Sequence, residues 1–150
     1  MINRLCEVLM IVGWLLIRYG SGEMVDNGGT LLGIAGRGFV LIASDTRLKD
    51  QYSVKSRRIS RIVEVEKELA LFGSGSFADF TELSHRLSLY ARDYKFKSNK
   101  ALNIRSLSHL VSNELYSRRF TSPYSTFCGV AGIDTSGIIR FHSCTLLRHH

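Results

Sequence analysis

The chain has 150 residues, of which 45% are hydrophobic, and a formal net charge of +7. This size is sufficient for one domain with a hydrophobic core. The basic residues are spread along the chain and interleaved with acidic ones, which argues against a nucleic-acid-binding face, because such faces concentrate Lys and Arg beside stacking aromatics. A basic contact patch for an acidic protein partner fits this distribution better.

The cysteines and histidines show no spacing typical of a metal site. Cys6, Cys128 and Cys144 contain no CxxC pair and are odd in number, which predicts neither a zinc site nor a disulfide framework and favours a reducing compartment. His142 and the terminal pair His149–His150 also lack the spacing of known metal sites. We therefore expect no metal and no cofactor.

The front of the chain holds ten uncharged apolar residues, VLMIVGWLLI, between Arg4 and Arg18. This run is shorter than the roughly 20 apolar residues of a membrane span, but it is long enough for the core of a signal peptide. A signal peptide, a removable pro-segment and a wrongly predicted first exon all remain open. We expect residues 1–28 to be a pro-segment or a non-native leader.

Short apolar runs, bounded by glycine or charged residues, then predict strands. Four of these runs precede any helical pattern: Thr30–Ala35, Phe39–Ser44, Ile62–Val65 and Leu69–Phe72. The last two are expected to form a hairpin around a turn at Glu66–Glu68.

The hydrophobic period next changes to that of helices. We expect one helix to begin after Ser76 and a second after the N-cap Asn103. The two apolar stripes are Phe77, Phe80, Leu83, Leu87, Tyr90, Ala91 and Tyr94, and then Ile104, Leu107, Leu110, Val111 and Leu115. A closing hairpin of Thr126–Ile133 and Ile138–His142 follows. Strands, two helices and further strands in this order predict the α+β class.

A glycine motif, GSGSFA at Gly73–Ala78, matches the dinucleotide-binding fingerprint G-x-G-x-x-A, and Asp93 lies about 20 residues beyond its start. The surrounding pattern is not a βαβ unit, and Asp93 falls within the helical segment. We therefore predict a tight strand-to-helix turn in which side chains would collide.

Several motifs in a fixed order resemble the beta subunits of the proteasome core particle. They are GGTLLGIAGRGFVLIASDTR, RISRIVEV, LALFGSGSFAD, LYARDYKF, LYSRRFTSPY and FCGVAGIDTSG, which together span about residues 26 to 142. NGGT, ASDTR and LYSRRF look closest to the non-catalytic sixth beta subunit. The resemblance implies the N-terminal nucleophile hydrolase fold, a four-layer α-β-β-α sandwich.

Active members of that family use a threonine whose own α-amine, released by cleavage of a Gly–Thr bond, activates its hydroxyl. The resemblance places the family aspartate on Asp45, the nucleophile position sixteen residues earlier on Gly29, and the lysine position sixteen residues later on Arg61. Thr30 is thus one residue late, an offset that turns a strand side chain to the opposite face.

The expected chemistry fails at two positions. Gly29 has no hydroxyl, and Arg61 cannot act as a base because a guanidinium in a protein has only hydrogen-bond donors and no acceptor. We expect no catalytic residue, with Asp45 and Arg61 forming a structural charge pair. A β-bulge that realigns Thr30 is the alternative that would preserve activity.

The resemblance ends after IIRFHS, and the second helical layer and the closing strands have no counterpart. We expect residues 29–142 to be a partial proteasome beta-type domain and residues 143–150 an unmatched tail. A truncated gene model is favoured over a reduced subunit that its neighbours stabilise. In either case one sheet would keep an apolar face exposed.

Three functions remain open. The first is a non-catalytic subunit of the proteasome core particle in ATP- and ubiquitin-dependent protein degradation, in the cytoplasm and nucleus. Its partners would be alpha and beta subunits in stacked seven-membered rings, not nucleic acid or a membrane, and its candidate contact residues are Arg57, Arg58, Arg118 and Arg119. The second is a threonine protease that uses Thr30 after Gly29–Thr30 cleavage. The third and weaker is a secreted or membrane-associated binding module.

Overall fold

The computed structural model describes residues 26–36, 39–133 and 139–144. Its strands are β1 (Leu31–Gly36), β2 (Phe39–Ser44), β3 (Leu48–Lys49), β4 (Val54–Ser56), β5 (Ile62–Glu66), β6 (Leu69–Gly75), β7 (Thr126–Ile133) and β8 (Ile139–Cys144). Its helices are α2 (Phe77–Ser98) and α3 (Ile104–Ser117). The predicted leader and the final tail residues 145–150 lie outside the described residues.

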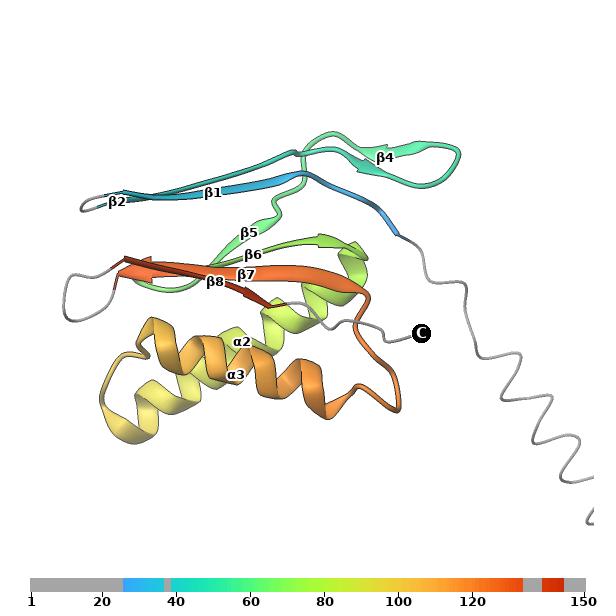
Figure 1. The fold of residues 1–150 in the computed structure, drawn as a ribbon. Coiled ribbons are helices and arrows are strands. Elements are labelled where there is room, and N and C mark those ends of the chain that lie inside the picture. The colour runs from blue at the N-terminus through green and yellow to red at the C-terminus, as the bar shows by residue number, and fades with distance from the viewer. Residues whose placement is uncertain (1–25, 37–38, 134–138, 145–150) are drawn as a thin grey trace, which may run out of the picture.

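The described elements form three layers (Figure 1). Strands β5, β6, β7 and β8 make an antiparallel sheet in that order, and β1 and β2 make a separate hairpin. Both helices cover one face of the four-stranded sheet, and the hairpin lies over the other face. The α+β class is therefore confirmed, with an α-β-β order of layers in this part of the chain.

Each predicted strand is present, although β1 and β8 begin one residue later than predicted and β6 extends three residues beyond the predicted end at Phe72. The bounds of β2 and β7 are those predicted, and β5 and β6 pair as the expected hairpin. The expectation of four strands before the first helix is wrong, because β3 and β4 form an additional antiparallel pair. These strands have two and three residues and carry charged side chains, so they lack a hydrophobic period that could reveal them.

Both helices begin where the capping residues predict. The Ser76 side chain accepts a hydrogen bond from the backbone N–H of Asp79, at 3.3 Å, and the Asn103 side chain accepts one from the N–H of Ser106, at 2.7 Å. Helix α2 ends at Ser98, and its C-cap residue Asn99 adopts the left-handed conformation with a φ of 52°. Asparagine tolerates this conformation better than most residues, so the sequence also determines where α2 stops.

The hydrophobic core lies between the helices and the four-stranded sheet. Its fully buried members are Leu71, Leu83, Leu87, Ile104, Leu107, Val111 and Val130, and Phe80 packs with them. Tyr90 and Tyr94 were expected on the buried stripe of α2 but are exposed, because they stand at its margin. With Leu102 and Leu110 they line a groove of about 490 Å³ beside α3.

The glycine motif lies at the predicted junction of strand and helix, but Gly73 and Gly75 belong to the end of β6, and only Ser76 separates β6 from α2. A Cβ atom at Gly73 would lie 2.2 Å from Cδ2 of Phe80, and one at Gly75 would lie 2.7 Å from the backbone oxygen of Ser125. Asp79 accepts a hydrogen bond from the backbone N–H of Ser125, at 2.7 Å. Close packing of β6, α2 and β7 therefore accounts for the glycines without a nucleotide.

Candidate functional site

Three segments meet where the family aspartate, nucleophile and lysine positions were expected to converge. Gly29 stands just before β1, Asp45 directly follows β2, and Arg61 directly precedes β5. The backbone N–H of Thr30 donates to Oδ1 of Asp45, at 3.2 Å, and the backbone N–H of Asp45 donates to the backbone carbonyl oxygen of Thr30, at 3.1 Å. Asp45 thus holds the backbone of residue 30 on both sides.

Arg61 forms the centre of this site. Its side chain is 1% exposed, and its Nε donates to Oδ1 of Asp45, at 3.1 Å. Its Nη2 also donates to the backbone oxygen of Arg47, at 3.2 Å. A buried guanidinium requires such acceptors because removing an unpaired charge from water is costly. Asp45 and Arg61 therefore form the charge pair that the sequence predicts.

Gly29 has no room for a side chain. A Cβ atom at this position would lie 2.6 Å from Cζ and 2.7 Å from Nε of Arg61. The φ of Gly29 is 119°, a conformation that residues with a Cβ rarely adopt. The backbone and the Arg61 guanidinium therefore both select glycine at the position matched to the nucleophile.

Thr30 is exposed and lies beside this position instead of occupying it. The β1–β2 pairing runs from Leu31 opposite Ser44 to Gly36 opposite Phe39 without a shift in register. A bulge would appear as such a shift. The described hairpin therefore offers no bulge that would move the Thr30 hydroxyl into the position of the nucleophile.

The four basic residues proposed for subunit contacts differ in their surroundings. Arg57 and Arg58 are exposed in the connection between β4 and β5. Arg118 forms ion pairs with Glu82 and Glu114 of the same chain. Arg119 stacks on two aromatic rings, with its Cζ 3.5 Å from the centre of Tyr116 and 4.2 Å from that of Phe120. Because Phe120 is 84% exposed, Arg119 belongs to a surface aromatic cluster.

A network of charges joins α2 to α3. Arg86 Nη1 lies 3.0 Å from Oε1 of Glu114, and Arg118 Nη2 lies 3.2 Å from Oε1 of Glu82. Tyr124 donates from its hydroxyl to Oε1 of Glu82, at 3.4 Å. Burial raises the pKa of Tyr124, Arg118 opposes this shift, and Glu82 adds to it. The pattern of the sequence did not reveal this network, because its pairs are up to 42 residues apart.

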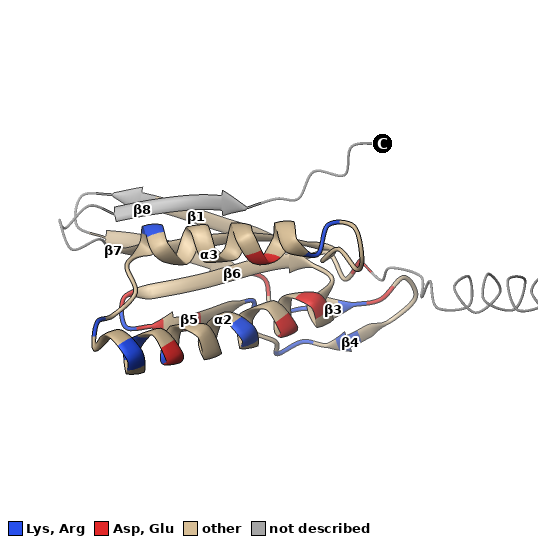
Figure 2. Cartoon of the chain, turned by 90° about the horizontal axis from the view of Figure 1, so that it is seen from below, with Lys and Arg blue, Asp and Glu red and all other residues tan. Residues whose placement is uncertain are grey.

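The charges do not define a binding face of one sign. Figure 2 shows basic and acidic residues together along α2. Among the described residues, no group of three or more His, Cys, Asp or Glu side chains could hold a metal ion. In the same part of the chain, no helix is long and apolar enough to cross a membrane.

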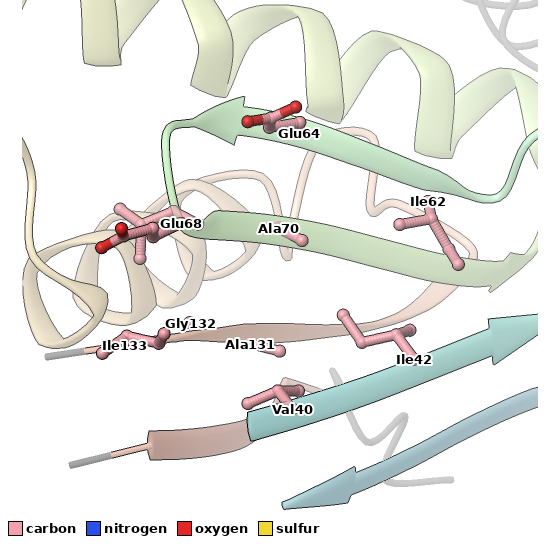
Figure 3. A pocket seen from close by; sticks show the side chains of 10 residues that line it. Val40, Ile42, Ile62, Glu64, Glu68, Ala70, Ala131, Gly132 and Ile133 are labelled. Atoms are coloured by element: carbon pink, nitrogen blue, oxygen red, sulfur yellow. The ribbon is translucent and has the colours of Figure 1, made fainter. Parts of the chain in front are cut away.

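A cleft of about 320 Å³ opens between the hairpin and the four-stranded sheet (Figure 3). Val40 and Ile42 of β2 line one side, and the small side chains Ala70 and Ala131 lie on the other. Glu64 and Glu68 also line the cleft. This mainly apolar space lacks the convergent polar groups of a catalytic pocket. We interpret it as incomplete packing between the two sheets.

Comparison with known proteins identifies the family to which the chain belongs. Residues 25–144 match the family described as proteasome subunit. The chain is 38% identical to the proteasome subunit beta type-1 of Dictyostelium discoideum over 123 residues, which is 81% of this chain and 52% of that protein.

Two further relatives show the same extent of similarity. The proteasome subunit beta type-1 of Oryza sativa subsp. japonica is 35% identical over 80% of this chain and 54% of its own length. The proteasome subunit beta type-6 of Saccharomyces cerevisiae is 36% identical over 75% of this chain and 46% of its own length. The chain spans about half the length of the curated relatives it matches.

Proposed function

Because the chain belongs to the proteasome subunit family, we propose that it is a non-catalytic structural beta subunit of the proteasome core particle. It contributes to a beta ring and to the wall of the proteolytic chamber. Its partners are alpha and beta subunits in stacked seven-membered rings, in the cytoplasm and nucleus. Similarity to proteins that are named beta subunits supports the proposal.

One observation supports the proposal that this subunit is non-catalytic: Arg61 occupies the space that a side chain at position 29 would need. A catalytic residue at this position would need a hydroxyl as nucleophile, a free α-amine and a nearby group that can exchange a proton. Gly29 supplies no hydroxyl, and the Arg61 guanidinium has only hydrogen-bond donors and no acceptor for a proton. Arg61 instead holds Asp45, at 3.1 Å, and so fixes the junction between β2 and β5.

The outer face of the β1–β2 hairpin supports the four-layer architecture that we propose for the complete subunit. Large apolar side chains on this face are about half exposed: Leu32 53%, Ile34 49%, Phe39 54% and Leu41 54%. Contiguous apolar surface of this kind commonly marks an interface. A second helical layer over this face would bury both sides of the hairpin.

The exposed aromatic cluster around Arg119 supplies a surface for a neighbouring subunit. Aromatic residues and arginine are enriched at the centres of protein interfaces. Arg119 already stacks between Tyr116 and Phe120. Less side-chain freedom is therefore lost when a partner covers the cluster, because the guanidinium is held in place before binding.

Assembly of the tagged full chain in cells tests the proposal. We expect the chain to co-purify with a particle of several hundred kilodaltons and the variant Arg119→Glu to enter that particle less. Arg92→Glu, an exposed residue on α2, is the control for the change in charge. Recovery of the chain outside any such particle, with a cooperative melt of its own, would contradict the proposal.

A second candidate, a protease that uses Thr30, has one observation in its favour. The Thr30 nitrogen lies 3.2 Å from Oδ1 of Asp45, so an amine released by Gly29–Thr30 cleavage would lie next to a carboxylate. Sequencing the N-terminus of the chain from cells tests this directly. A start at Thr30 would support the protease, and a start upstream would reject it.

A further inference from the structure

Two cysteines that are distant in the sequence lie opposite each other in the sheet. The register of β7 and β8 pairs Cys128 with Cys144, and it continues without a shift to Ile133 opposite Ile139. Directly opposed residues in an antiparallel pair have Cα atoms about 4.5 or 5.5 Å apart. Disulfides span Cα separations of about 4.4–6.8 Å, so both values are compatible with a bond.

We propose that Cys128 and Cys144 form a redox-sensitive dithiol that closes into a cross-strand disulfide when the chain meets a peroxide. Within the described residues, β8 is the last strand of the four-stranded sheet, and Cys144 is its final residue. The bond would fasten this end of β8 to β7. It would therefore restrain separation of β8 from the sheet.

The position of Cys128 indicates what the bond would stabilise. Its side chain is 4% exposed and packs in the hydrophobic core with Val130 and Leu71 beneath the helices. A disulfide at this position would therefore be attached to β7, the strand that contributes Cys128 and Val130 to the hydrophobic core. Burial also limits access of aqueous oxidants, so the pair is expected to respond to sustained oxidation and to stay reduced otherwise.

The reaction needs no cofactor beyond the peroxide. One thiolate attacks a peroxide oxygen, the O–O bond breaks, and the departing hydroxide takes up a proton to become water. The second thiolate attacks the sulfenic acid so formed, the S–S bond replaces the S–O bond, and the displaced hydroxide takes up the proton that the second thiol had lost, which gives a second water. The two thiols lose two electrons in total, and the peroxide accepts them.

Spacing along the chain does not reveal this pair. The two cysteines are sixteen positions apart, without a CxxC motif, and the total of three cysteines does not indicate a disulfide framework. The register of β7 and β8 is what brings them together. This inference is independent of the proposed function, since it requires only that the two strands pair as described.

Oxidation of the full chain, purified natively in the reduced state, tests the inference. The protein is treated with hydrogen peroxide, its remaining thiols are alkylated, and it is digested without reductant for mass spectrometry. We expect a linked peptide pair that joins residues 128 and 144, lighter by two hydrogens than the two free peptides. We also expect a reducible rise in Tm of roughly 5–10 °C, because the link restricts the unfolded chain.

Three variants and a comparison in denaturant serve as controls. Cys6→Ser should leave the yield of the link unchanged, whereas Cys128→Ser should abolish it. Cys144→Ser should also abolish it, and this variant leaves the buried side chain intact if Cys128→Ser fails to fold. Linkage between residues 128 and 144 should exceed that of the same chain oxidised in denaturant. Equal linkage in denaturant, or recovery of both cysteines unlinked from oxidised folded protein, would overturn the inference.

Discussion

Two apolar surfaces of this chain, the helix side of the four-stranded sheet and the outer face of the β1–β2 hairpin, are buried to different degrees. On the helix side of the four-stranded sheet, side chains such as Leu87 and Leu107 are fully buried. On the outer face of the β1–β2 hairpin, Leu32 and Leu41 are about half exposed although they are equally apolar. The first surface is closed by α2 and α3 of the same chain, and the second lacks such a cover among the described residues. Similar hydrophobicity thus gives different burial.

The difference originates in the strands themselves. In β2, Val40 and Ile42 face the four-stranded sheet, while Phe39 and Leu41 face outward. A strand with one face in water usually alternates apolar and polar residues, and a strand buried on both faces reads as a continuous apolar run. FVLIAS has the second pattern. The hairpin therefore has the composition of an interior strand pair.

The largest expected effect compares one leucine from each surface. Leu107→Ala should lower the free energy of unfolding by about 2–5 kcal/mol, because it leaves a cavity in the closed core. Leu41→Ala should cost less than about 1 kcal/mol, because its side chain is 54% exposed. Urea denaturation of both variants measures this difference. Similar losses would mean that the hairpin face is buried in the isolated chain.

The next effect concerns the junction between the hairpin and the sheet. Gly29→Ala should destabilise the fold by about 1–3 kcal/mol, because of its φ of 119° and the 2.6 Å approach to Arg61. Gly28→Ala is the matched control, since its φ is 62° and an added Cβ would only touch Lys49, at 3.4 Å. Thermal denaturation should rank Gly29→Ala as the more damaging. The opposite ranking would mean that Arg61 does not fill this space.

The charge pair at the same junction gives a third comparison. Asp45→Asn should cost about 1–3 kcal/mol, because it leaves the buried Arg61 guanidinium without its carboxylate. Asp50→Asn removes an ion pair with Lys55 that is open to solvent and should cost less than about 0.5 kcal/mol. Urea denaturation tests both variants. Equal losses in the free energy of unfolding for the two variants would mean that the Arg61 guanidinium is in contact with water.

The smallest expected effect concerns the ionisation of Tyr124, which lies at the edge of the buried core. The folded-state pKa of Tyr124 is raised by burial, so its neutral phenol contributes stability that is complete below about pH 10 and is lost as pH rises further. Tyr124→Phe removes this titration and keeps the ring. The difference in unfolding free energy between wild type and variant should therefore change only above about pH 10. Parallel pH profiles would contradict the raised pKa.

Local patterns predicted much of the fold because their causes are local. Ser76 and Asn103 cap their helices as expected, and the bounds of β2 and β7 agree with their apolar runs. The pairing of Asp45 with Arg61 was expected from the family resemblance and is observed at 3.1 Å. In these cases capping residues, apolar runs and the residue spacing taken from the family resemblance were sufficient to predict the structure.

The remaining features depend on tertiary arrangement. The short strands β3 and β4 follow from pairing with each other, not from a hydrophobic period. Tyr90 is exposed because the orientation of α2 leaves it at the margin of the core. The contact of Arg118 with Glu82 and the opposition of two cysteines arise only when distant segments are aligned. A single sequence contains no local signal for such contacts.

The most direct test of the account is the intact mass of this chain in particles purified from cells, before and after treatment with a covalent inhibitor that reacts with N-terminal threonines. Our account predicts a chain that begins upstream of Thr30 and gains no inhibitor mass, because the family resemblance matches the nucleophile to Gly29, whose side-chain space Arg61 fills. A chain that begins at Thr30 and gains the mass of one inhibitor would contradict it.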